Sequence, residues 1–117
     1  MLIASVSGIR FTLDEPVRDI VAKYVAAFAK THRGLILIGR DGRQSGLKIQ
    51  KMIIETLRGM KREAEDCGTL PTPTLSLAVI DRRASGGIMI SASHNPAEWN
   101  GLKFFEADGT YVHEAPC

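Results

Sequence analysis

The sequence is poor in cysteine, has no long apolar run and carries little excess charge of either sign. Two cysteines among 117 residues are too few for a disulfide framework, and both are interpreted as ordinary thiols of a reducing compartment. No apolar segment approaches the roughly 18 residues needed to span a bilayer, and the N-terminus lacks the basic and apolar regions of a targeting signal. The 15 basic and 13 acidic residues are scattered along the chain, so no broad surface for nucleic acid is expected. We therefore expect a cytoplasmic protein whose partners include neither a membrane nor a nucleic acid.

The apolar residues that are present recur at helical spacing in three segments. The first begins at Pro16 and ends before Gly34. The second begins near Ser45. The third begins at Thr72, which is expected to cap the helix, with Pro73 at the first helical position. Three helices are predicted.

Three short apolar runs predict buried strands, at residues 35–38, 87–91 and 102–105. The sequence ADGTYV at 107–112 then predicts a hairpin turn. Strands that alternate with helices indicate an α/β fold, which we expect to be a three-layer α/β/α sandwich around a mixed, mainly parallel sheet. Without repeats or low-complexity linkers, residues 1–117 are expected to form a single domain.

Segment 61–67, KREAEDC, occupies the place where this alternation calls for a further strand. It carries five charges in its first six residues. A central strand would bury these charges, whereas on an edge strand they discourage pairing with other chains. We therefore predict an edge strand or an extended link that contributes little to the core.

A polar loop follows strand 87–91, at the sheet edge where ligands bind in such folds. This loop contains Ser93 and His94. A lone loop serine is more often structural than nucleophilic, and adjacent serine and histidine side chains diverge in an extended loop, which argues against a hydrolase dyad. The G-x-S-x-G elbow of the hydrolases is also missing.

Positive charge distinguishes the surroundings of Ser93. Loops and strand ends that can converge on it carry Arg10, Arg40, Arg43 and Lys103. Glycine-flanked loops also present backbone N–H groups to anions, so the combination suits a phosphate. A dinucleotide site is disfavoured because GRDGRQSG, at 39–46, lacks the spacing G-x-G-x-x-G.

Four motifs follow one another along the chain. They are SGIR (7–10), GRDGRQSG (39–46), GTLPTP (68–73) and GIMISASHNP (87–96) with the following WNGLK (99–103). Together they resemble the α-D-phosphohexomutases, the phosphoglucomutase and phosphomannomutase superfamily, and the last motif resembles its active-site signature. The resemblance covers nearly the whole chain and implies that it corresponds to the first of four domains.

The resemblance implies a role for each motif residue. Ser93 would carry the transferable phosphate, with Arg10, His94 and Lys103 as further catalytic residues around it. In that family the phosphoserine phosphorylates a sugar monophosphate, giving a 1,6-bisphosphate that turns over in the site and returns its other phosphate to the serine. The expected supporting residues of the phosphate loop are Asn95, Asn100, Arg40, Asp41 and Arg43. Of these, Arg40, Asp41 and Arg43 are expected to buttress the loop through ion pairs.

The resemblance also implies components that this sequence lacks. The family's Mg²⁺ is held by the phosphoserine, here Ser93 through its phosphate, and by a D-x-D-x-D loop in a second domain, which does not occur here. The residues that read the sugar lie in further domains, so glucose, mannose and glucosamine phosphates are not distinguished. The expected partners are a phosphosugar and the missing domains of the same enzyme, and the chain alone is expected to be incapable of turnover.

Two alternatives remain, and the sequence departs from the family pattern at Phe11, at Ser91 and at KREAEDC (61–67), where the family normally has an apolar strand. The chain is either a piece of a longer enzyme or a stand-alone copy, and a non-catalytic module that binds a phosphorylated ligand or serves in assembly is the alternative function. A hydroxyl at Ser93 among cations such as Lys103 favours the enzyme, because a binding module has no need of it. Phe11 stands where the family usually has glycine, which predicts a less close approach to ligand, and Ser91 replaces the usual threonine.

Overall fold

The computed structural model describes residues 1–5 and 8–112. The strands are β1 (Leu2–Ser5), β2 (Gly8–Thr12), β3 (Ile36–Arg40), β4 (Ala64–Thr69), β5 (Gly86–Ile90) and β6 (Trp99–Glu106). The helices are α1 (Val17–Thr31), α2 (Gly46–Gly59) and α3 (Thr72–Asp81). Within the described ranges, none of the helices has the length and apolar character needed to cross a membrane.

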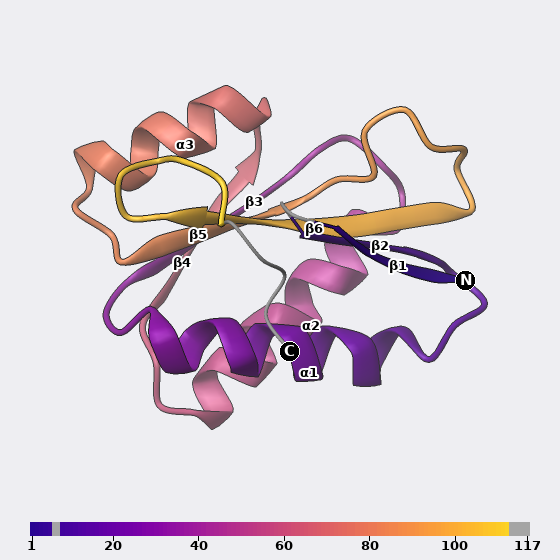
Figure 1. The fold of residues 1–117 in the computed structure, drawn as a ribbon, viewed down its shortest axis with the longest axis horizontal. Coiled ribbons are helices and arrows are strands. Elements are labelled where there is room, and N and C mark those ends of the chain that lie inside the picture. Colours follow the sequence, from indigo (N-terminus) through magenta and orange to yellow (C-terminus); the bar gives the residue numbers. More distant parts are fainter. Residues whose placement is uncertain (6–7, 113–117) are drawn as a thin grey trace.

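One six-stranded sheet runs through the middle of the molecule, in the order β1-β2-β6-β5-β3-β4 (Figure 1). β5, β3 and β4 are parallel to one another, whereas β1, β2 and β6 contribute three antiparallel pairings. The predicted α/β fold with a mixed sheet is confirmed. The antiparallel part is larger than expected because β1 and β2 were not anticipated. The exposed side chains at the start of β1 show no apolar alternation that would mark a strand.

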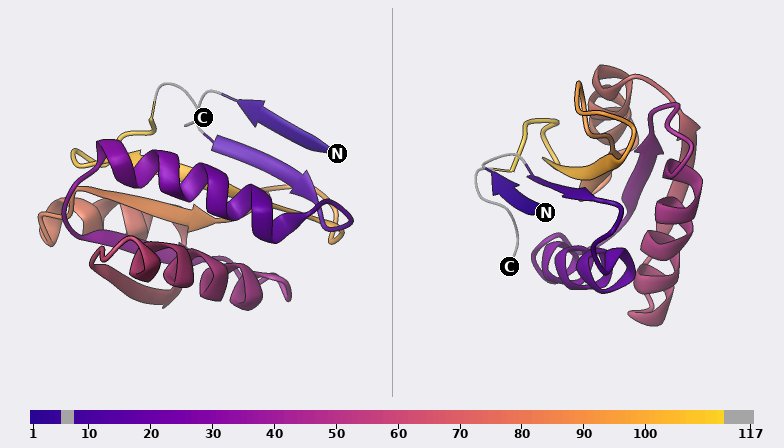
Figure 2. Two further views of the ribbon diagram at one scale, coloured as in Figure 1. Left: turned by 90° about the horizontal axis from the view of Figure 1, so that it is seen from below. Right: turned by 90° about the vertical axis from the view of Figure 1, so that its right-hand side faces the viewer.

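Helices cover both faces of this sheet, which confirms the three layers (Figure 1). On one face, Leu75 and Val79 of α3 pack with Leu37, Met89 and Phe105 of the sheet. On the other face, α1 and α2 lie next to each other (Figure 2) and share one larger core with the sheet. The apolar stripes of these two helices point into that core, which we call the α1–α2 core.

β4 is an edge strand, as predicted. It pairs with β3 alone, and none of its residues is buried. Its half-buried residues Ala64 and Cys67 pack against the two cores. Burial raises the pKa of the Cys67 thiol, and the nearby carboxylate of Glu65 raises it further. The charges of segment 61–67 therefore lie at the rim of the sheet.

Two local predictions, a cap and a turn, have different outcomes. The turn after β6 closes as a hairpin, because the N–H of Glu106 donates to the carbonyl of Thr110 at 2.8 Å. The capping role of Thr72 is wrong. Thr72 is the first residue of α3, the N-cap is the extended Pro71, and no side chain caps this helix. The carbonyl of Pro71 accepts the first helical hydrogen bonds instead.

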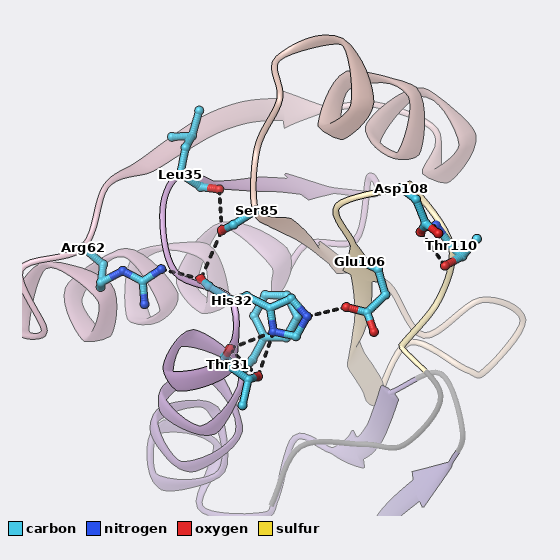
Figure 3. Close-up of polar contacts among 9 residues, drawn as sticks. Thr31, His32, Leu35, Arg62, Ser85, Glu106, Asp108 and Thr110 are labelled. Atoms are coloured by element: carbon cyan, nitrogen blue, oxygen red, sulfur yellow. Dashed lines mark hydrogen bonds and ion pairs between the residues drawn. The ribbon is translucent and has the colours of Figure 1, made fainter.

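Polar contacts around His32 join the C-terminal end of α1 to neighbouring segments (Figure 3). The ring of His32 stacks on Phe28 with ring centroids 4.0 Å apart, and its Nε2 lies 2.5 Å from Oε1 of Glu106 on β6. The carbonyl of His32 accepts hydrogen bonds from the guanidinium of Arg62 and from the hydroxyl of Ser85. These contacts fix the C-terminal end of α1 against the sheet.

Candidate functional site

The loops that follow β3 and β5 lie next to each other at the carboxyl end of the parallel strands. The N–H of Asp41, directly after β3, donates to the carbonyl of Ile90 at 3.0 Å. The N–H of Ser91, directly after β5, donates to the carbonyl of Gly101 at 2.9 Å. Residues 91–98, which we call the Ser93 loop, then rise above the sheet on the side of α3 (orange in Figure 1). The loops thus lie at the edge that the sequence predicted.

Ser93 is exposed and lies in a tight turn of this loop. Its φ of 54° falls in the left-handed region, which is uncommon for a residue with a side chain. The turn closes through a hydrogen bond of 3.0 Å from the N–H of Asn95 to the carbonyl of Ala92. The N–H of Ser93 also donates to the hydroxyl of Ser91 at 3.1 Å. Such strained backbone persists only where surrounding contacts enforce it, and it clusters at functional sites.

Arg43 supplies most of the contacts that enforce this conformation. Its guanidinium donates hydrogen bonds to backbone carbonyls of the loop and its end, at Ser93 (3.0 Å), Asn95 (2.5 Å), Pro96 (2.7 Å) and Trp99 (3.2 Å). Asp41 orients Arg43. Its carboxylate accepts a hydrogen bond from the backbone N–H of Arg43 at 3.0 Å and lies 3.6 Å from Nε of the guanidinium. The expected support by Arg43 and Asp41 is present, but the guanidinium acts on carbonyls rather than on a carboxylate of the loop.

We expect Arg43→Ala to lower the free energy of unfolding by about 2 kcal/mol, because charged hydrogen bonds to several carbonyls are lost together. Urea denaturation measures the change, and hydrogen exchange should show loss of protection within residues 91–99. Arg18→Ala is the matched control. Arg18 forms an exposed ion pair with Glu55, so its removal should cost about 0.5 kcal/mol or less. Equal effects of the two substitutions would contradict the proposed anchoring.

Arg10 on β2 and Lys103 on β6 stand on the same face of the sheet. The strand neighbours of both cations are buried in the α1–α2 core: Ile9, Phe11, Leu102 and Phe104. Because side chains alternate along a strand, Arg10 and Lys103 project from the opposite face. The register pairs Arg10 with Gly101 and Lys103 with Gly8, so each cation stands opposite a glycine. No side chain on the paired residue occupies the space between them.

These two cations interact with each other, and Arg10 also contacts the Ser93 loop. Nη1 of Arg10 donates to Oδ1 of Asn95 at 3.4 Å, which joins β2 to the loop. Burial lowers the pKa of Lys103, and the positive charge of Arg10 lowers it further, while Asp41 opposes the shift. The result is a pair of like charges on one face of the sheet, of which Lys103 is partly buried and Arg10 is exposed. An anion bound there would relieve their repulsion.

Three other predicted site residues differ in their contacts within the described chain: Asn100 and Arg40 bond to neighbouring elements, and His94 does not. Asn100 is fully buried and donates from Nδ2 to the hydroxyl of Ser45 at 2.7 Å, so it joins β6 to α2. Arg40 donates to Gln50 of α2 at 2.6 Å and to Thr69 of β4 at 2.8 Å. The expected ion pair from Arg40 to the loop is therefore wrong, because its guanidinium is directed to the other side of β3. The exposed ring of His94 makes no hydrogen bond within the described chain.

Phe11 and Ser91, where the sequence departs from the family pattern, are both buried. Phe11 is fully buried in the α1–α2 core, so its side chain lies on the face of β2 opposite to Arg10 and does not obstruct that face. Ser91 is buried, and its hydroxyl caps the N–H of Ser93. Sequence reasoning missed this contact, although a serine two residues before a turn is a known signal for it.

Magnesium, which the resemblance implies, does not fit the residues of this chain by themselves. Within residues 1–5 and 8–112, no three His, Cys, Asp or Glu side chains are grouped closely enough to hold a metal ion. The carboxylate of Asp41 lies near Lys103, but it is engaged by Arg43. A metal at this site would depend on ligands from outside the described residues.

Comparisons with known proteins agree with this geometry. The family model "Phosphoglucomutase/phosphomannomutase, alpha/beta/alpha domain I" matches residues 3–116. A phosphoglucosamine mutase of Sulfurovum sp. is 38% identical over 92 residues, which are 79% of this chain and 20% of the relative. Another, of Anaeromyxobacter dehalogenans, is 44% identical over 78 residues, which are 67% of this chain and 17% of the relative.

The structure is also similar to a solved one. A putative phosphomannomutase from Thermus thermophilus superposes with a TM-score of 0.82 at 28% identity, over 95% of this chain and 27% of that protein. The chain spans about a fifth of the length of the curated relatives it matches. The family match over nearly the whole chain shows that this chain belongs to the phosphoglucomutase/phosphomannomutase family, as its α/β/α domain I.

Proposed function

We propose that this chain is the phosphoserine-bearing domain of a phosphohexomutase that interconverts sugar 1-phosphates and 6-phosphates. The observation that carries the proposal is the state of Ser93. Ser93 is exposed, its backbone is held in a left-handed turn, and Arg10 contacts the loop that contains it through Asn95, while Lys103 projects from the same face of the sheet as Arg10. The alternative of a non-catalytic binding module has no need of an exposed hydroxyl at this position, and the family match supports the enzyme.

The proposed chemistry is transfer of a phosphoryl group between Ser93 and a sugar hydroxyl. On loading, a bond forms between Ser93 Oγ and phosphorus while the bond from phosphorus to a sugar oxygen breaks, and the serine proton ends on that sugar oxygen. Such transfers depend on positive charge around the phosphoryl oxygens more than on covalent help. In this proposal Arg10 and Lys103 supply that charge, and the ring of His94 carries the proton. Mg²⁺, with ligands from another domain, would add further charge in the complete enzyme.

The proposed substrates are hexose phosphates, with the sugar 1,6-bisphosphate as intermediate and activator. Several relatives are named phosphoglucosamine mutases, so glucosamine phosphate is the first substrate to test. We propose that the partners of this domain are the other domains of the same enzyme, which would grip the sugar and the distal phosphate. The proposed compartment is the cytoplasm, in keeping with the free thiol of Cys67.

The direct test is the intact mass of the chain after incubation with glucosamine, glucose or mannose 1,6-bisphosphate. We expect the mass to rise by one phosphate group, with fragment ions that place it on Ser93. A coupled assay of the same sample with the 1-phosphates and Mg²⁺ should show no multiple turnovers, because an open half-site neither excludes water nor fixes the metal. Failure to take up any phosphate from all three donors would count against the proposal.

Lys103 provides a second, pH-dependent test. Its pKa lies below the ordinary value because of burial and Arg10, so its proton leaves at lower pH than those of exposed lysines. A dianionic phosphate on Ser93 should raise this pKa, since an opposite charge favours the ammonium form. The titration is followed by NMR of ¹³C-dimethylated lysines, with the Lys103 signal assigned by Lys103→Arg. If the Lys103 pKa is the same in the phosphorylated chain, Lys103 does not lie close to the phosphate, and its proposed role is wrong.

A further inference from the structure

A groove of about 920 Å³ lies next to the Ser93 loop, between the start of α1, the first half of α2 and that loop. Its volume is within the range of small-molecule sites. Asn95 and Ala97 are the loop residues that border it, whereas Ser93, Arg10 and Lys103 do not line it. The groove is therefore adjacent to the proposed phosphate site but distinct from it.

The walls of the groove are largely apolar and partly exposed. They include Leu13 and Val17 before and at the start of α1, and Leu47 and Met52 of α2. Leu13 is 38% exposed and Leu47 is 47% exposed. Covering such side chains with an apolar group removes apolar surface from water and lowers the free energy.

Positive charge is concentrated on the same groove. Its lining includes Lys48 and Lys51, which are one helical turn apart on α2. Arg43 also lines it, but its guanidinium is already engaged by Asp41 and by the loop carbonyls. The described residues that line it include no carboxylate. Within the described chain, Lys48 and Lys51 have neither a hydrogen bond nor an ion pair. Two unpaired ammonium groups above apolar walls are complementary to a ligand with an apolar body and an anionic head.

Two carboxylates close to the groove in sequence have partners of their own. Glu55, one turn beyond Lys51, is paired with Arg18 at 2.8 Å. Glu15 lies 2.5 Å from the N-terminal ammonium. Asp14 and Glu98, which are next to Leu13 and Ala97 in the sequence, do not line the groove.

We propose that this groove binds an amphiphilic phosphate monoester, in which an apolar chain or ring lies along Leu13, Leu47 and Met52 and the phosphate is held by Lys48 and Lys51. A sugar phosphate does not fit this description, because its body is covered with hydroxyl groups. The groove is thus a second binding site that is independent of phosphate transfer at Ser93. Phosphate uptake at Ser93 and binding in the groove can each fail without the other.

Octyl phosphate is the probe, and two partial probes define which parts are needed. Octyl glucoside has the tail without the charge, and inorganic phosphate has the charge without the tail. In ¹H–¹⁵N NMR titrations of the chain we expect octyl phosphate to shift the amides of Leu13, Leu47, Met52 and Ala97, with saturation at concentrations where neither partial probe shifts them. Equal shifts from either partial probe, or shifts confined to the exposed Leu77 and Ile80 of α3, would overturn the proposal.

Two exposed variants test the contacts without removing core residues. Lys48→Glu combined with Lys51→Glu should weaken octyl phosphate binding about tenfold or more through loss of both charged contacts. Leu47→Ser should weaken it about threefold through loss of apolar contact. Lys30→Glu combined with Arg33→Glu changes the net charge equally, away from the groove, and is the matched control. An equal loss in this control would show a general charge effect and overturn the site.

Discussion

The chain with Ser93→Ala is expected to take up no phosphate from a sugar 1,6-bisphosphate under conditions in which the unchanged chain accepts one. The hydroxyl is the only part of the residue that is removed, so Arg43 still has its carbonyl acceptor at position 93. Alanine in the left-handed region has a strain similar to that of serine, and the fold should be retained. Intact mass over a time course measures the loss, and circular dichroism checks the fold.

Ser91→Ala is the matched control for this experiment. It removes a hydroxyl two residues away, which caps the N–H of Ser93 but is itself buried. We expect slower phosphate uptake in this variant, not its abolition. Phosphate on the Ser93→Ala chain would contradict the assignment. If the modification were then lost in acid, as a phosphorylated imidazole is, a histidine would be the acceptor, and fragment ions would show whether it is His94.

Gly101→Ala is expected to lower the free energy of unfolding by about 3 kcal/mol or more, the largest effect on stability that we predict. A Cβ at this position would lie 2.5 Å from the carbonyl oxygen of Ile9 and 3.0 Å from that of Ser91. Both are backbone atoms, which cannot rotate out of the way as a side chain can. β2 and the start of the Ser93 loop must therefore both move away from β6. The pairing of Arg10 with Gly101 would be lost with that movement.

Urea denaturation of Gly101→Ala is best compared with that of Gly59→Ala. Gly59 is the last residue of α2, and no atom lies within 4 Å of the position that its Cβ would take. Alanine there should stabilise the chain by about 0.5 kcal/mol, because glycine is a poor helix former. The same substitution is therefore expected to act with opposite sign at the two positions. A loss below about 1 kcal/mol at Gly101 would mean that the strands adjust easily.

Local sequence signals were sufficient for most of the framework. The apolar stripe of α1 and the buried run of β5 have the periods of a helix and of a buried strand, and both elements were predicted. The charges of β4 indicated an edge strand, because buried charges without partners are too costly for a central one. The position of Ser93 after β5 followed directly, since it depends only on where that apolar run ends.

Signals of this kind were missing where an element is stabilised by distant residues. Leu2, Ile3 and Ala4 of β1 have exposed side chains, and the strand is held by its pairing with β2, so these residues carry little strand pattern. The partner of Asn100 is Ser45, which is 55 positions away in the sequence. The cap of α3 was misplaced by one residue, because threonine and proline both favour helix starts.

The sequence by itself determined the family, the fold class and the loop that contains Ser93, since motifs and apolar periods are properties of neighbouring residues. Only the tertiary structure decided what Arg40 and Arg43 do. Both are arginines of the same motif, yet one joins β3 to α2 and β4, while the other holds the Ser93 loop. Carbonyl acceptors exist at every residue and leave no mark in the sequence, so the partner of an arginine is settled by which backbone the fold brings within reach of its guanidinium.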